Sequence, residues 1–380
     1  MIAVFPELLI SLTMQCTLLL FVARFLVKRT QASEAADHLW SCCHLMILLL
    51  SLAGVLLPHA RLFQGASILR LCHQATALPV SQSLWMGVFW LWIFVAAALT
   101  VNMLRSLIQI SLLVRRAVDL QLSIIAGEPG IGNASRSLTA ELEDLQIRVV
   151  TSASCATPFC WQLHRPVIVL PESLSAFPAD ELCAVIRHEL AHLKARHPLR
   201  LFLQRLLEIG FWFHPLVWYT SRDAAMQREL SADCLANRTQ TEVAAFLRSL
   251  VRLSESSSRR VPVLSIGLNL ISGSASVIQR RVDQLLAIDC ALPRRSSFAL
   301  LPVDHVRSAV RSAVHSAVCL AFTGILAAGV WIPLNSQASG RTLFSPWPTS
   351  TATLLHEAGI EVRDYELDSH RIVEEFHDND

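Results

Sequence analysis

The sequence predicts a multi-pass α-helical membrane protein with about four transmembrane helices and a mainly helical α+β domain between the third and the fourth. Hydrophobic residues make up 53% of the 380 residues and charged residues only 16%, below the roughly 25% of soluble proteins. Apolar runs long enough to cross a bilayer, which takes about 20 residues, occur near both ends of the chain. The block 105–312 between the last two runs carries strand and helix signals instead.

The apolar runs are 3–26, 39–57, 84–104 and 313–334. Each exceeds the roughly 10–14 residues typical of a buried core helix, so we interpret all of them as membrane spans rather than as core helices. The charged residues of the first run, Glu7 and Arg24, lie near its ends, where a side chain can reach water. This run has no basic leader and no small-residue cleavage site, so we do not interpret it as a removable signal peptide.

Lysine and arginine in the short loops predict the orientation in the cell membrane. They are absent before the first run and gather in the first loop, after the third run and before the fourth. The N-terminus and the tail 335–380 are therefore expected outside, and the block 105–312 in the cytoplasm. The basic residues concerned are Lys28, Arg29, Arg105, Arg115, Arg116, Arg294, Arg295, Arg307 and Arg311.

Charge and cysteine content exclude two classes of function. The formal net charge is +2, which gives no overall argument for a nucleic-acid partner, so no direct nucleic-acid binding is expected. Among the ten cysteines only Cys72 falls in an outer loop, so no disulfide framework is predicted. Cys155 and Cys160 are five residues apart, which is wrong for a metal knuckle, and are interpreted as buried thiols.

Within the block, the element order is helices, then two strands, then helices. The strands are β-branched and bounded by turn residues, and one helix is delimited by Pro178 and Pro198. The apolar stretch 199–219 contains charged residues and a Gly210/Pro215 pair, so we expect two helices packed on the core rather than a fifth span. The expected elements are helix 106–126, loop 127–135, helix 137–145, strands 146–150 and 165–171, helix 179–194, a helix from 215 to about 237, linker 254–260 and helix 277–287.

The stretch RHELAHLKARH at 187–197 carries the chemistry. On a helix, residues four apart share a face, so His188 and His192 can present two imidazole nitrogens to one tetrahedral zinc. Glu189 lies about 100° further round, near enough to take a proton from water at an open coordination position. The alternative is a solvated polar helix face, but apolar neighbours such as Val185 and Leu190 indicate a buried helix. The pattern therefore predicts peptide-bond hydrolysis.

A third metal ligand is required, and the stretch QRELSADC supplies the favoured one. Glu229 and Asp233 are four residues apart on one helix face, so Glu229 can bind the metal while Asp233 orients a ligand histidine from behind. Glu208 is the next alternative. The other acids considered, and disfavoured, are Asp180, Glu181 and Asp223.

These motifs resemble the membrane zinc metallopeptidases of the β-lactam-sensor type, which control β-lactamase and methicillin-resistance genes. The resemblance rests on RPVIVLP, HELAH, FWFHPLVW and RELSAD within 156–234, and the order of spans extends it. It implies a gluzincin-like α+β peptidase domain, with an edge strand that aligns the substrate backbone. It also implies zinc as cofactor, with ligands His188, His192 and Glu229, catalytic base Glu189 and supporting residue Asp233.

The chain departs from this family in three places. His197 stands where the family often has an acid, and Gln162 where it usually has glycine. His197 and His214 lie near the motif but are weak ligand candidates. The lysines are Lys28 and Lys194 alone, so the tail lacks the Ser-x-x-Lys pattern that reacts with a β-lactam, and β-lactam binding is not expected.

The leading functional hypothesis is a membrane-embedded zinc metalloendopeptidase with a cytoplasmic active site. Its expected partners are the lipid bilayer and a protein substrate in transmembrane signalling. A DNA-binding repressor as that substrate comes from the resemblance alone. One alternative is a quality-control protease for misfolded membrane proteins. Another is a non-catalytic receptor or scaffold with a structural zinc, against which Glu189 argues, because a structural site has no use for such a base.

Overall fold

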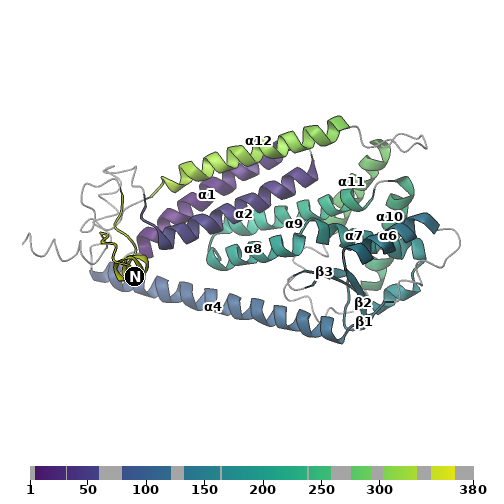
Figure 1. Ribbon diagram of the computed structural model, residues 1–380, viewed down its shortest axis with the longest axis horizontal. Helices are drawn as coiled ribbons and strands as arrows, with labels where there is room; N and C mark the ends of the chain where they lie inside the picture. Colours follow the sequence, from purple (N-terminus) through teal and green to yellow (C-terminus); the bar gives the residue numbers. More distant parts are fainter. Residues whose placement is uncertain are drawn as a thin grey trace, which may run out of the picture.

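The computed structural model describes residues 5–30, 32–59, 79–120, 132–162, 165–237, 239–257, 275–291, 303–331 and 344–363. The molecule is mostly helical and elongated, with long helices side by side along most of its length and a small sheet near one end (Figure 1). The HELAH motif lies in the part of the molecule that carries the sheet.

Three helices are long and apolar enough to cross a membrane: α1 (Phe5–Arg29), α2 (Ser33–Leu56) and the part Ser83–Arg116 of α4 (Pro79–Arg116). They cover most of the first three predicted runs; residues 3 and 4 lie outside the described part of the chain, and Leu57 follows the end of α2. α4 continues beyond its predicted span into the following block, but the expected helix 106–126 is wrong for 117–120, and its last part, 121–126, lies outside the described residues. The chain there turns into strand β1 (Val118–Asp119), because Val118 pairs with Thr151 of the sheet.

The fourth predicted run coincides largely with α12 (Val303–Ala328), which lies beside α1 and α2 (Figure 1). Its apolar part, Ala313–Ala328, is shorter than the other candidates, so a fourth span stays a prediction. The end of this segment is fixed to α1: Trp331 Nε1 donates a hydrogen bond to Glu7 Oε1 at 2.5 Å, and Gln15 Nε2 donates to the Val330 carbonyl at 3.0 Å.

Two further helices join the sheet end to this bundle. The stretch 199–219 forms α8 (His197–Gly210) and the start of α9 (Pro215–Ala236), as predicted, with Pro215 in the first turn of α9. Their apolar side chains share one buried core with α1, α2 and α12. That core includes Leu19, Leu20, Trp40, Ile47, Leu207, Phe211, Val217, Ala224 and Leu320.

α4 runs apart from the other long helices and presents apolar side chains outward (Figure 1). Trp92 Nε1 donates a hydrogen bond to the Gly210 carbonyl at 3.0 Å, which fixes α4 to the end of α8. A row of exposed apolar side chains of this length is rare on a soluble protein and fits contact with lipid. The row includes Leu84, Trp90, Leu91, Phe94, Val101, Leu104, Ile108 and Leu112.

The sheet has the strand order β1-β2-β4-β3, formed by β1, β2 (Arg148–Ser152), β4 (Val167–Pro171) and β3 (Phe159–Trp161). β2 and β4 are parallel, and the other two pairs are antiparallel. β3 is therefore an edge strand, and it contacts α7 (Ala179–Lys194). The strand expected at 146–150 begins only at Arg148, because Gln146 has a positive φ of 52° and closes a turn. β1 and β3 were not predicted.

The remaining elements are α6 (Gly132–Asp144), the short η1 (Glu172–Ala176), α10 (Gln240–Ser257), α11 (Ala275–Ala291) and α13 (Thr349–Glu357). The loop expected at 127–135 is wrong for 132–135, which belong to α6, and its first part lies outside the described residues. The linker expected at 254–260 is wrong for 254–257, which end α10. The helix expected at 277–287 is confirmed as part of α11.

Candidate metal centre

Helix α7 is held by an apolar face and carries the motif on the opposite side. Its first turn contains Asp180 and Glu181, whose charges favour a helix N-terminus. The helix ends at Lys194, and Arg196 takes the left-handed conformation (φ 55°) before α8 begins with a proline in its first turn. The buried side chains that anchor α7 to the sheet and to α6 include Leu182, Val185, Ile186, Leu190, Ile168, Leu170 and Leu142.

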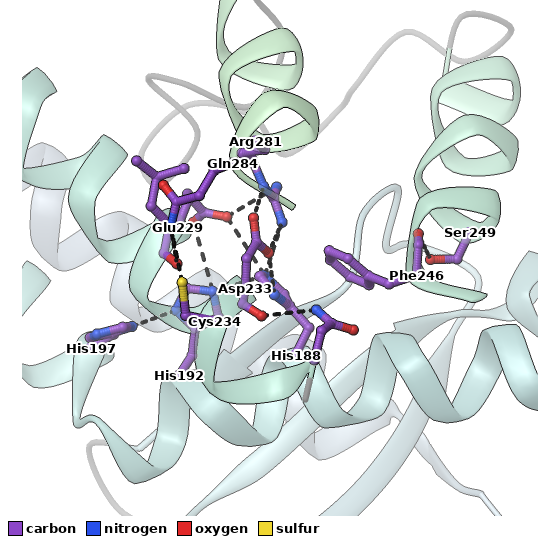
Figure 2. Close-up of polar contacts among 12 residues, drawn as sticks. His188, His192, His197, Glu229, Asp233, Cys234, Phe246, Ser249, Arg281 and Gln284 are labelled. Atoms are coloured by element: carbon purple, nitrogen blue, oxygen red, sulfur yellow. Dashed lines mark hydrogen bonds and ion pairs between the residues drawn. The ribbon is translucent and has the colours of Figure 1, made fainter. Parts of the chain in front are cut away.

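Helix α9 brings the third predicted ligand to the motif (Figure 2). One possible ligand atom each of His188, His192 and Glu229 lies within 4.8 Å of the others. The Nε2 atoms of the two histidines are 3.1 Å apart. Glu229 Oε2 lies 3.6 Å from His188 Nε2, and Glu229 Oε1 lies 3.7 Å from His192 Nε2. The structure thus brings together the three residues that the sequence predicted as ligands.

Both imidazole rings are fixed from behind. His188 Nδ1 lies 3.0 Å from Asp233 Oδ1, and the Asp233 side chain is fully buried. His192 Nδ1 lies 2.7 Å from His197 Nδ1. Because a neighbouring side chain lies within 3.0 Å of each rear nitrogen, Nε2 of each ring is the atom left to face a metal, as in most histidine metal sites.

Glu189 is buried between helix α7 and the edge strand, with 7% of its surface exposed. Burial and the nearby Glu229 charge raise the pKa of Glu189 to about 7, against the opposing influence of His188 and Arg281. The Cys160 thiol of β3 hydrogen-bonds to Glu189, and burial raises the pKa of that thiol well above its usual range. Cys160 is therefore a protonated, half-buried thiol, whereas Cys155 is buried, as the sequence predicted.

The protonation of His192 and Glu229 suits a cation, whereas His188 carries a proton that a cation would displace. Burial holds the pKa of His192 well below its usual range, so its ring is neutral. Burial also acts to lower the pKa of His188, but Asp233 and Glu229 outweigh it and raise that pKa to about 9. Burial opposes ionisation of Glu229, yet Arg281 and the histidines hold its pKa well below its usual range. Binding of a cation at neutral pH would therefore release a proton from His188.

Arg281, on α11, is a functional candidate that the sequence reading missed. Its guanidinium donates to both Asp233 oxygens, at 2.7 and 2.8 Å, and Nη1 lies 3.2 Å from Glu229 Oε2. The Nη2 atom of Arg281 also lies 3.4 Å from His188 Nε2 (Figure 2). The sequence marked this region only as an amphipathic helix, and nothing in that pattern distinguishes Arg281 from Arg280, which is exposed.

Phe246 was also missed, because its helix, α10, was not predicted. Its ring stacks on that of His188, with centroids 5.0 Å apart, and so covers one side of the site. Gln284 of α11 donates a hydrogen bond to Ser33 Oγ of α2 at 2.9 Å. α11 therefore contacts the metal-binding residues and the start of the second apolar helix together.

Glu208 and His214, which were also considered as ligands, lie elsewhere. Glu208 is buried in a cluster of α8, where Gln204 and Arg205 donate hydrogen bonds to it at 2.8 and 2.6 Å. His214 Nε2 is 2.9 Å from Thr17 Oγ1 in the helical bundle. Among the residues that the structure describes, the only group arranged to hold a metal is that of His188, His192 and Glu229.

The donor set fits zinc. Two imidazole nitrogens and one carboxylate oxygen form the ligand set of many catalytic zinc sites, which keep a further position open for water or substrate. A carboxylate behind one ligand histidine is the usual support in such sites. Glu189 follows the first histidine and is not one of the three predicted ligands, so it can supply the base that a hydrolytic zinc site needs.

Comparison with known proteins identifies a family for most of the chain. A family model described as BlaR1 peptidase M56 matches residues 7–285. The chain is 30% identical over 165 residues to the Regulatory protein BlaR1 of Bacillus licheniformis. That stretch covers 43% of this chain and 28% of the relative, so the similarity spans little more than a quarter of the relative's length. The family model covers α1 from Glu7 onward, α2, α4, α8, α9, the sheet and the predicted ligands, and it ends before α12.

Proposed function

The chain belongs to the BlaR1 peptidase M56 family, and on that premise we propose that it is a membrane-embedded zinc metalloendopeptidase that cuts a regulatory protein. Family membership makes it a peptidase associated with membranes. The proposal adds the metal, the residues that hold it, the side of the membrane and the class of substrate.

One observation carries the proposal. Two histidines of α7 and a glutamate of α9 point their ligand atoms at one place, and Glu189 is buried beside them. Side chains of this kind are costly to bury without partners, and a shared divalent cation satisfies all three ligands. His188, His192 and Glu229 are the proposed ligands, Glu189 is the proposed catalytic base, and Asp233 supports His188.

The chemistry follows from these positions. Zinc held there would polarise the scissile carbonyl and make water acidic enough to react near neutral pH. Glu189 takes the proton of the attacking water and passes it to the leaving amine, for which a base with a pKa near 7 is well matched. The Arg281 guanidinium beside Glu229 and His188 places a positive charge where the carbonyl oxygen becomes negative.

The edge strand β3 offers a way to hold the substrate. β3 pairs with β4 on one side, and its other side is the edge of the sheet. An extended peptide can add to such an edge through backbone hydrogen bonds. Because Cys160 of β3 contacts Glu189, a peptide bound along this edge would run past the proposed base.

The position of the site supports a cytoplasmic orientation. Ser33 and Asp37, at the beginning of α2, contact Gln284 and His197 of the metal-binding region. They follow directly on Lys28 and Arg29, the basic residues of the first loop. Loops with an excess of Lys and Arg face the cytoplasm, so the metal-binding region would lie on that side.

The class of substrate comes from the similarity. The Bacillus licheniformis relative is named a regulatory protein, and we extend a regulatory role to this chain. The proposed substrate is accordingly a protein partner such as a transcriptional repressor. Cleavage of misfolded membrane proteins, the alternative from the sequence, predicts instead a broad set of substrates.

Removal of the metal tests the proposal as a whole. The chain purified in detergent should contain about one zinc per molecule, and it should cut members of a proteome-derived peptide library. A chelator should abolish cleavage, and zinc should restore it. Mass spectrometry of the products also reports the scissile bond. A chain that holds no zinc, or whose cleavage survives complete removal of zinc, would refute the metallopeptidase assignment.

Arg281→Gln is expected to lower kcat about 100-fold with little change in KM, because loss of one donor to the developing negative charge typically has this effect. Arg280→Gln is the matched control, since Arg280 is the exposed neighbour on the same helix. Steady-state cleavage of a peptide identified from the library measures both constants. If Arg281→Gln and Arg280→Gln have equal activities, Arg281 has no role in catalysis.

A further inference from the structure

The two proposed histidine ligands are supported in different ways. His188 is supported by Asp233, from the same helix as Glu229. His192 is supported by His197, whose Nδ1 lies 2.7 Å from His192 Nδ1 (Figure 2). The other nitrogen of His197, Nε2, lies 3.1 Å from Asp37 Oδ2. Asp37 belongs to α2, one of the helices that can span the membrane.

The chemistry of these atoms fixes the direction of both hydrogen bonds. A histidine that binds metal through Nε2 carries its proton on Nδ1, so His192 must donate to His197. His197 Nδ1 must then be an acceptor, which places its own proton on Nε2. That proton is donated to the Asp37 carboxylate. Asp37, His197 and His192 therefore form one consistent chain of hydrogen bonds that leaves the Nε2 lone pair of His192 free for a metal.

The deep burial of His197 and Asp37 indicates that their contact is functional. The exposed fractions of His197 and Asp37 are 3% and 1%. An acidic residue buried in an apolar helix is costly and in membrane proteins commonly marks a functional position. The ion pair of Asp37 with Arg200 of α8 reduces this cost, but it does not require a histidine between Asp37 and the metal ligand.

We propose that His197 and Asp37 are positioning residues for the ligand His192, so that α2 of the apolar bundle is part of the metal centre. The inference rests on the zinc site proposed above. It gives the first loop and α2 an effect on metal binding. A shift of α2 against α8 would lengthen the 3.1 Å contact between Asp37 and His197 beyond hydrogen-bond range and free the ring of His197, which positions that of His192. Helix position in the membrane and metal affinity are then linked.

Substitutions at His197 provide the decisive comparison. His197→Phe keeps a ring but removes both polar atoms, and it should weaken zinc binding by about 10- to 100-fold, as loss of such support typically does. His197→Gln can accept from His192 through its oxygen and donate to Asp37 through its nitrogen, so it should recover most of the affinity. Competition with a chromophoric chelator on the full chain in detergent measures the zinc dissociation constant.

Asp37 supplies a second test, because it acts on the metal only through His197. Asp37→Ala alone should weaken zinc binding, whereas His197→Phe with Asp37→Ala should bind zinc no more weakly than His197→Phe alone. If the two substitutions weaken zinc binding independently, so that their losses add, the proposed positioning role of Asp37 is wrong. The two His197 variants decide the question even if Asp37→Ala does not fold.

Arg200→Gln is the matched control for a purely structural effect. It removes the Arg200–Asp37 ion pair between α8 and α2 but leaves both nitrogens of His197 and its carboxylate partner in place. Its zinc affinity should stay near that of wild type, whatever its thermal stability in the presence of chelator. If Arg200→Gln weakens zinc binding as much as His197→Phe, the contact is structural and the inference is wrong.

The outcome separates this inference from the proposed function. A wild-type chain that binds no zinc refutes the proposed function. If zinc binding depends on Glu229 but wild type and His197→Phe have equal zinc dissociation constants, only the positioning role of His197 and Asp37 is refuted. The visible spectrum of the cobalt-substituted protein adds a readout of ligand geometry, and it should change in His197→Phe and return in His197→Gln.

Discussion

Glu189→Gln is expected to abolish peptide cleavage and to leave zinc binding unchanged. Glutamine has nearly the same shape as glutamate but cannot take a proton from water, and loss of a general base typically lowers the rate by about 100- to 10,000-fold. Glu189 is not one of the three proposed ligands, so the zinc content should remain about one per molecule. Cleavage of the peptide library and elemental analysis of the same preparation measure both properties.

The control for this variant is Glu181→Gln. Glu181 is a second buried glutamate of α7, but it pairs with Arg252 at 2.8 Å instead of facing the metal-binding residues. It should therefore keep both zinc and activity. Equal cleavage by wild type and Glu189→Gln would remove the proposed mechanism while leaving the metal site standing. Loss of zinc in Glu189→Gln would instead make Glu189 part of the metal site.

Glu229→Gln is expected to lose the metal itself. The substitution removes the negative ligand that lies within 3.7 Å of both histidines and that offsets the charge of the cation. The zinc dissociation constant should rise by about 100-fold or more, beyond the effect of losing a supporting residue. Activity should fall with metal occupancy, so excess zinc should restore part of it.

Thermal unfolding provides an independent measurement of the same loss. A ligand that binds only the folded state stabilises it by about 2.7 kcal/mol at a free concentration 100 times its Kd. Zinc should therefore raise the Tm of wild type and of the control Glu208→Gln, because Glu208 lies with Gln204 and Arg205 away from the site. An unaltered response of Glu229→Gln to zinc would mean that another residue is the third ligand.

The apolar helices were largely predictable, because each is defined by length and composition alone. Three of the predicted runs lie in helices that can cross a membrane, and the division of 199–219 into α8 and α9 followed from Gly210 and Pro215. Short elements were not predictable. β1 and β3 have two and three residues, too few for a periodic pattern, and they exist because neighbouring strands supply hydrogen-bond partners.

By itself the sequence determined the local part of the metal site. Helical periodicity places His188 beside His192, and Glu229 beside Asp233, wherever the two helices lie. Only the tertiary structure decided that these pairs face each other, and that Arg281 of α11 and Asp37 of α2 complete the surroundings. Such contacts join segments far apart in the chain through packing, which leaves no spacing in the sequence. A buried histidine or arginine is therefore recognisable from sequence as a candidate, but its partner is not.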